Sequence, residues 1–121
     1  SPVYEGFIKV FDNVNYEIAT RVKCNLNINK TGYKKSSHQP IHIDQNLKGY
    51  KSLLYYINDS DGDTIFFNKK LKEIKRVTPK KNTAVLFDSN ILHCGSNPIK
   101  SDVRGVINFI FKGNENNILH R

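Results

Sequence analysis

Two histidines and an aspartate are the residues whose types and spacing could bind a metal ion. His42 and Asp44 form an H-x-D unit within Ile41–Asp44. If this segment is a strand, both side chains lie on one face, because alternate residues of a strand point the same way. An imidazole and a carboxylate side by side are costly to bury without a partner, and a metal ion would satisfy both. A simple His–Asp hydrogen bond would also explain the pair, and for the pair in isolation this structural explanation is favoured.

His93 supplies a third possible ligand, after the apolar segment Ala84–Phe87. Two histidines and one carboxylate on a β scaffold make a facial triad, which leaves open coordination positions on ferrous iron. Zinc is the alternative metal, because the same set of ligands serves zinc hydrolases. A zinc hydrolase would also need a general base near the site, and no such residue is evident in the sequence.

Arg104 begins the apolar segment Arg104–Phe111, eleven positions after His93. The alternation of a strand places Arg104 and Asn108 on the same face. An arginine at the end of a buried strand needs an anionic partner, and it pairs best with a carboxylate in bidentate geometry. The alternative is a surface arginine paired with Asp102 or Asp88, an interaction that would contribute little energy.

Short β-type segments, separated by turns rich in Asn, Asp, Gly and Pro, must position these residues. No helical periodicity stands out beyond one turn near Gln45–Lys48. Evenly spaced short strands are typical of a β-sandwich or barrel, and eight of them suit a jelly roll, the cupin-like double-stranded β-helix. The candidate strands are Gly6–Phe11, Tyr16–Ile28, Ile41–Asp44, Lys51–Ile57, Thr64–Phe67, Ile74–Thr78, Thr83–Phe87 and Arg104–Phe111. We therefore predict an all-β fold with few or no helices.

The size and composition suit one such domain over residues 1–121. Hydrophobic residues make up 38% of the 121 residues and aromatic residues 11%, which excludes intrinsic disorder. No apolar run could span a membrane and no signal peptide opens the sequence, so a cytoplasmic protein without a membrane partner is expected. Cys24 and Cys94 form no C-x-x-C pair, and we expect both to be reduced thiols in or near the core.

The charge balance is strongly basic. Nineteen Lys and Arg residues against 11 Asp and Glu residues give a net charge of +8, and part of the excess lies in Lys69–Lys81. Such an excess can attract a polyanionic partner, or it can form a solvated face. The sequence supports the two interpretations about equally.

Taken together and in order, the motifs resemble those of the iron(II)- and 2-oxoglutarate-dependent dioxygenases, particularly the prolyl-4-hydroxylase-like branch. Asp61–Phe67 resembles the family's G-(G/D)-(E/D)-T-x-F turn and strand. Val77–Phe87 resembles its V-x-P-K-x-G-x-A-V-x-F block, with Asn82 where Gly is usual, and Leu54–Asn58 resembles the strand after H-x-D. The resemblance is strongest over residues 33–111.

The resemblance implies a site for Fe(II) formed by His42, Asp44 and His93. It implies that Arg104 holds the distal carboxylate of the cosubstrate 2-oxoglutarate and that Tyr56 hydrogen-bonds the same group, although a plain core tyrosine is an equal alternative. Asn108 is expected to line the pocket because it shares the face of Arg104. Lys100 competes for the anion-binding role, but its Pro- and Ser-flanked loop position favours Arg104.

The reaction that the resemblance implies is hydroxylation of a C–H bond, coupled to oxidative decarboxylation of 2-oxoglutarate to succinate and CO2. The expected substrate is peptidyl, prolyl included, or a small molecule. O2 is the oxidant, and ascorbate is a candidate additional cofactor. Asn25 and Asn27 stand where relatives often place an aromatic residue near the cosubstrate, and no Trp follows the basic residue, so substrate identity does not follow from the resemblance.

Two alternatives stay open. The first is the same chemistry on a nucleic-acid substrate bound through Lys69–Lys81, but repair demethylases of this superfamily carry a second arginine along the last strand, and Gly105–Lys112 has none. The second is a non-catalytic jelly-roll binding module in which the His42–Asp44 pair is structural.

Overall fold

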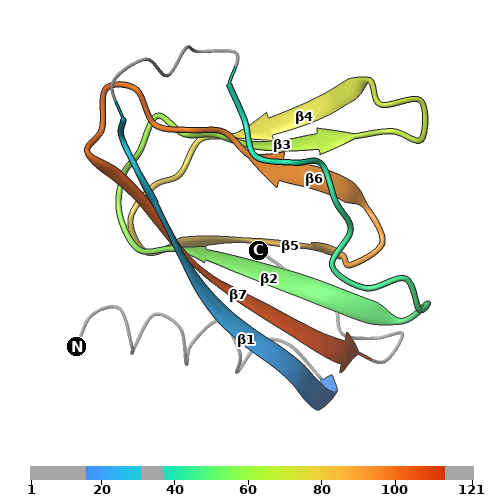
Figure 1. Ribbon diagram of the computed structural model, residues 1–121. Helices are drawn as coiled ribbons and strands as arrows, with labels where there is room; N and C mark the ends of the chain where they lie inside the picture. The colour runs from blue at the N-terminus through green and yellow to red at the C-terminus, as the bar shows by residue number, and fades with distance from the viewer. Residues whose placement is uncertain (1–15, 31–36, 114–121) are drawn as a thin grey trace.

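The computed structural model describes residues 16–30 and 37–113, and within these ranges the chain forms seven β-strands and no helix (Figure 1). The strands are β1 (Tyr16–Ile28), β2 (Tyr50–Tyr56), β3 (Thr64–Phe67), β4 (Glu73–Val77), β5 (Thr83–Asp88), β6 (Leu92–Gly95) and β7 (Val103–Gly113). All paired strands run antiparallel.

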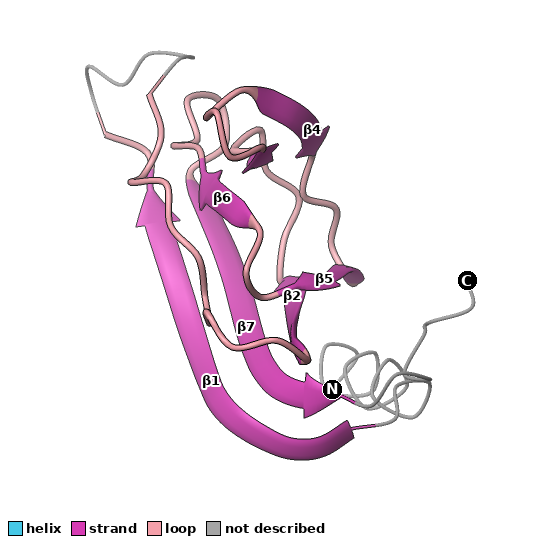
Figure 2. Ribbon diagram, turned by 90° about the vertical axis from the view of Figure 1, so that its right-hand side faces the viewer, coloured by secondary structure: helices cyan, strands magenta, loops and turns pink. Residues whose placement is uncertain are grey.

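The strands form two sheets that lie face to face (Figure 1). The four-stranded sheet has the order β1-β7-β2-β5, and the three-stranded sheet has the order β4-β3-β6. From β2 onward the chain passes repeatedly from one sheet to the other. Figure 2 shows β1 and β7 as two long, curved strands side by side. This arrangement confirms the predicted all-β jelly roll.

An apolar cluster from both sheets fills part of the space between them. Its buried members are Leu54, Tyr56, Phe66, Phe87 and Val106. Alternate residues of β2 point to the opposite face, where Leu53 packs against Phe111. Burying a large apolar side chain contributes about 1.5–3 kcal/mol, so this interior cluster is a main source of cohesion between the sheets.

Six of the predicted strands are confirmed to within two residues at each end. The prediction of a strand at Ile41–Asp44 is wrong, because the segment forms only an isolated bridge between His42 and His93. Its backbone turns toward Ser89, whose carbonyl accepts the amides of both Asp44 and Gln45. The predicted strand Gly6–Phe11 lies outside the described residues.

The two cysteines have different environments. Cys94 is a buried free thiol that packs with Ile65 and Phe67, as predicted. Cys24 is a free thiol but exposed, so its predicted place in or near the core is wrong. The reason is its position on β1, which in the described part of the chain is the edge strand of the four-stranded sheet. In the described ranges no helix could cross a membrane.

Candidate metal centre and cosubstrate pocket

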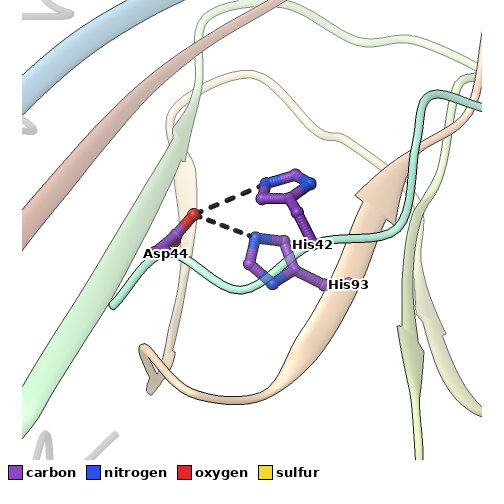
Figure 3. A group of neighbouring side chains, drawn as sticks. All are labelled: His42, Asp44 and His93. Atoms are coloured by element: carbon purple, nitrogen blue, oxygen red, sulfur yellow. Dashed lines mark ion pairs between the residues drawn. The ribbon is translucent and has the colours of Figure 1, made fainter. Parts of the chain in front are cut away.

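The structure brings the three predicted metal ligands together (Figure 3). His42 and Asp44 lie on the connection between β1 and β2, and His93 lies on β6. The backbones of His42 and His93 exchange two hydrogen bonds, of 3.0 and 2.9 Å. This exchange holds the two imidazole rings side by side, with centroids 4.5 Å apart. A hydrogen bond of 2.9 Å from Asp44 N to Ser89 O then directs the carboxylate toward both rings.

The ligand atoms have the geometry and protonation that a metal ion requires. Asp44 Oδ1 lies 3.5 Å from His42 Nε2 and 3.3 Å from His93 Nε2. The Nδ1 atoms of the two histidines lie 3.0 Å from Pro40 O and 2.8 Å from Ile91 O. A carbonyl oxygen can only accept, so each ring carries its proton on Nδ1 and presents the Nε2 lone pair to the site. The three residues therefore fit a divalent metal ion.

The second oxygen of Asp44 is occupied by hydrogen bonds from the four-stranded sheet. Oδ2 accepts from Ser52 Oγ on β2 at 2.6 Å and from Asn108 Nδ2 on β7 at 3.2 Å. The Ser52 hydroxyl also contacts Ser89 Oγ at 2.8 Å. These partners leave Oδ1 for the metal and fix the carboxylate plane, which is the usual task of residues behind a metal ligand.

Sequence reasoning missed Ser52. In the sequence Ser52 is recognisable only as a small polar residue at an inward-facing position of a mostly apolar strand. That Asp44 lies opposite it becomes evident from the fold. Asn108, which we expected to line the pocket, lies beside the metal ligands and donates a hydrogen bond to Asp44.

The electrostatics favour a charged carboxylate at the metal centre. Burial alone would raise the pKa of Asp44, but the hydrogen bonds that protonated His42 and His93 rings would donate, together with the one from Ser52, outweigh it and hold this pKa well below its usual value. The hydrogen bond to Asp44 raises the pKa of His42, against the opposing effects of burial and of the Lys23 charge. The His42 side chain is 52% exposed, compared with 5% for Asp44 and 6% for His93. The site is therefore open to solvent on the side of His42.

Arg104 forms a second charged feature in the interior. It lies on β7 and is 5% exposed. Its Nε donates to Gly62 O and its Nη2 to Thr64 Oγ1, both at 2.7 Å. Within residues 16–30 and 37–113 no carboxylate forms an ion pair with it. Burial lowers the pKa of the guanidinium, as expected for a cation with neutral partners. Because an uncompensated buried charge is costly, this is a place for an anion.

Thr64 connects the Arg104 guanidinium with the Tyr56 hydroxyl. The Tyr56 hydroxyl donates to Thr64 Oγ1 at 2.8 Å, the same oxygen that accepts from Arg104. Burial raises the pKa of Tyr56, so the phenol stays a neutral donor. The Thr64 hydroxyl accepts two bonds and keeps its own hydrogen to donate. Thr64 was not predicted as a site residue, although it is the Thr of the turn-and-strand motif.

Two glycines make room for the guanidinium. A Cβ at Gly95 would lie 2.8 Å from Arg104 Cζ, and a Cβ at Gly62 would lie 2.9 Å from Arg104 Cδ and 2.6 Å from Ser96 O. All three distances are shorter than side chains tolerate, so a larger residue at Gly95 must displace the arginine, and one at Gly62 must displace the arginine and the Ser96 backbone. Lys100, the competing cation, is exposed, and its backbone amide binds Asp61.

Comparisons with known proteins agree with this site. The family model of the 2OG-Fe(II) oxygenase superfamily matches residues 26–112. Among solved structures, a cupin protein from Bacteroides fragilis is similar with a TM-score of 0.55 and 8% identity, over 82% of this chain and 70% of that chain. A Pseudomonas putida prolyl-4-hydroxylase is similar with a TM-score of 0.53 and 17% identity, over 79% of this chain and 53% of that enzyme. No match was found among the curated proteins.

At these identities the two solved structures show the fold alone. The match to the family model is of another kind, since it spans most of the chain and includes the H-x-D unit, the second histidine and the arginine. The chain therefore belongs to the 2OG-Fe(II) oxygenase superfamily.

Proposed function

We propose that this protein is an Fe(II)/2-oxoglutarate-dependent dioxygenase that hydroxylates a C–H bond of a peptidyl or small-molecule substrate. One observation carries the proposal: the His42, Asp44 and His93 group lies in the same interior as a buried arginine, Arg104, that forms no ion pair with any described residue. Asn108 and Arg104 lie on the same face of β7, and Asn108 binds the metal ligand Asp44. Arg104 and Asn108 are four residues apart on this strand, so their backbones lie roughly 13 Å apart. An arginine side chain and a five-carbon dicarboxylate together are long enough to cover this distance.

The residues have separate tasks in this proposal. His42 and His93 would hold Fe(II) through Nε2, and Asp44 through Oδ1. When bound, Fe(II) supplies the redox chemistry that couples decarboxylation of 2-oxoglutarate to C–H oxidation. Arg104 and the Thr64 hydroxyl hold the distal carboxylate of the cosubstrate, a charge-assisted contact that also fixes its orientation.

Apolar side chains limit the access of water to this interior. Leu54, Val106 and Phe87 line the space between the sheets. The Phe87 ring packs edge-on against the His93 imidazole, with centroids 4.8 Å apart. Apolar surroundings that exclude water strengthen the arginine–carboxylate interaction and protect the reacting groups from solvent.

The basic segment Lys69–Lys81 does not favour the nucleic-acid alternative. It covers β4 and its flanking turns, at the edge of the three-stranded sheet. Arg76 within it is already paired with Glu73 at 2.7 Å and with Asp63 at 3.6 Å. We therefore keep the peptidyl or small-molecule substrate as the proposal.

An anaerobic titration with Fe(II) and then 2-oxoglutarate tests the function. The visible charge-transfer band of the chelate reports the ternary complex. We expect a band for the wild type and for Lys75→Ala, a control on exposed β4. His42→Ala removes the band, and Arg104→Gln requires more than about tenfold higher 2-oxoglutarate, as expected for loss of a buried charged contact. Circular dichroism verifies that each variant is folded. A folded wild type without a band contradicts the proposal.

A further inference from the structure

The side chain of Asn108 has one unused hydrogen-bonding atom beside the metal centre. Its Oδ1 is buried and has no partner within the described residues. The orientation of the amide is fixed, because the opposite end must be the NH2 group that donates to the Asp44 carboxylate. An unsatisfied buried acceptor costs about 1–3 kcal/mol. Oδ1 is therefore a place for a hydrogen-bond donor from a ligand.

Two cations of β1 lie on the same face of the sheet as Asn108. In the antiparallel pairing of β1 with β7, Lys23 is directly opposite Asn108, and Arg21 is opposite Ile110. Directly opposed residues point to the same face, with Cα atoms about 4.5–5.5 Å apart. The charge of Lys23 is close enough to act on His42. Both cations therefore lie at the metal end of the interior face.

In the described ranges neither cation is neutralised by a carboxylate. Arg21 and Lys23 are exposed, and neither forms an ion pair in residues 16–30 and 37–113. Carboxylates elsewhere are engaged with other cations: Asp88 with Lys51, and Glu73 and Asp63 with Arg76. Asp44 itself faces the two imidazoles. The metal centre thus has positive charge on its open side and an unsatisfied hydrogen-bond acceptor, Asn108 Oδ1, in the interior next to it.

We propose that the substrate presents a carboxylate to Lys23 and Arg21 and an N–H group to Asn108 Oδ1, as an acidic amino-acid residue does. This inference rests on the proposed function for the reaction itself, and it adds the substrate class. In one Glu or Asp residue the amide N–H and the carboxylate are separated by a few bonds. This spacing suits Asn108 Oδ1 and the Lys23 cation, because these two residues are directly paired across β7 and β1. A phosphodiester backbone provides the anion but no N–H donor.

Binding of defined probes tests the inference without turnover. The protein, loaded with Zn(II) in place of Fe(II) and with 2-oxoglutarate, is titrated calorimetrically with acetyl-Ala-Ala-Glu-Ala-Ala-amide and its Gln and Lys counterparts. We expect the Glu peptide to bind at least about threefold more tightly than the Gln peptide and the Lys peptide to bind most weakly. Free glutamate is a separate arm, which distinguishes a free amino acid from a peptide as the source of the same chemistry.

Matched variants and a modified probe locate the effect. Lys23→Gln and Arg21→Gln each weaken the Glu peptide by about 3–10-fold and leave the Gln peptide unchanged. Lys23→Glu reverses the preference toward the Lys peptide, and Lys75→Gln, on β4, changes nothing. N-methylation of the Glu residue removes the N–H and weakens binding to the unaltered protein by a similar factor, which tests Asn108 Oδ1 without disturbing Asp44.

Several outcomes overturn the inference: no probe binds at millimolar concentration, the three peptides bind alike, or a ten-residue oligothymidylate binds more tightly than the Glu peptide. The proposed function fails separately, through the absence of the charge-transfer band. If the charge-transfer band forms but the peptides bind without selectivity, only the proposed substrate class is rejected. Lys23-dependent selectivity without a band retains the recognition surface and removes the oxygenase chemistry.

Discussion

Ser52 illustrates how a hydroxyl that does not bind the metal controls a residue that does. Its Oγ donates to Asp44 Oδ2 at 2.6 Å and thereby keeps Oδ1 directed at the histidines. We expect Ser52→Ala to weaken metal binding by about 10-fold, within the usual range for partners of metal ligands. Competition with a chelator for Zn(II) measures the change. Ser96→Ala is the control, because its buried hydroxyl donates to Asp63 O instead. Equal losses in the two variants would contradict a specific role for Ser52.

Gly95 allows a test of the anion pocket that leaves the metal ligands unchanged. A methyl group at this position would lie 2.8 Å from Arg104 Cζ, so Gly95→Ala must displace the guanidinium. We expect the dissociation constant for 2-oxoglutarate to rise by more than about tenfold, with Zn(II) affinity retained. In the control Gly105→Ala, the nearest atom to the new methyl group is Asn58 Oδ1 at 3.3 Å. Unchanged 2-oxoglutarate binding in Gly95→Ala would show that Arg104 does not hold the cosubstrate.

At the scale of elements, local patterns predicted strands well and short connecting segments poorly. Thr64–Phe67 and Tyr16–Ile28 match the predicted bounds, since alternation or continuous apolar character is a local property. The segment Ile41–Asp44 alternates like a strand, yet its backbone bonds go to His93 and Ser89, far along the chain. Strand β6 was missed because its four residues include a histidine and a glycine, and its pairing with β3 depends on long-range contacts.

The one departure within the V-x-P-K-x-G motif has a structural explanation. Asn82 has φ of +64°, in the left-handed region where Gly is usual and Asn is the best-tolerated substitute. Its side chain also accepts a hydrogen bond from the Tyr55 hydroxyl. The candidate metal ligands were found from residue types and order, whereas Ser52 and Thr64 needed the fold, because their roles depend on partners from other strands.

The connection before β7 is held by one carboxylate. Asp61 accepts backbone hydrogen bonds from Ile99, Lys100 and Ser101 at 3.2, 2.9 and 3.0 Å. Burial alone would raise the pKa of Asp61, but these hydrogen bonds outweigh it, so the pKa lies below its usual value. Because the pKa of Asp61 is lower in the folded protein, the charged carboxylate stabilises the folded state at pH values above its unfolded-state pKa of about 3.9. This contribution is lost as the pH falls through the folded-state pKa.

We therefore expect Asp61→Asn to lower the free energy of unfolding at pH 7 by about 1 kcal/mol, a modest value because the carboxylate is partly screened by solvent. The difference from wild type should shrink as the pH falls below about 4. Urea unfolding at several pH values measures it. Asp102→Asn, an exposed carboxylate on the same connection, serves as the control. A difference that is independent of pH would contradict the assignment to the Asp61 charge.

At the scale of the molecule, both parts of the site join the two sheets. Arg104 on β7 binds Thr64 on β3, and Asp44 links Ser52 on β2 with His93 on β6. Ligands that bind across the sheets stabilise only the folded protein. We expect Zn(II) and then 2-oxoglutarate, each at about 100 times its dissociation constant, to raise Tm in two steps of roughly 5 °C or more. Arg104→Gln should retain the first step and lose the second. A single step in the wild type would contradict two sites.

The unpaired charge of Arg104 has a consequence for the lifetime of the protein in a cell. Without an anion, the partners of the buried guanidinium in the described part of the chain are the neutral groups Gly62 O and Thr64 Oγ1, so the cost of desolvating it reduces the free energy of folding. Proteases degrade the transiently unfolded fraction, and that fraction grows when the pocket is empty. The abundance of the protein would then rise and fall with the supply of dicarboxylate, independently of how fast its gene is expressed.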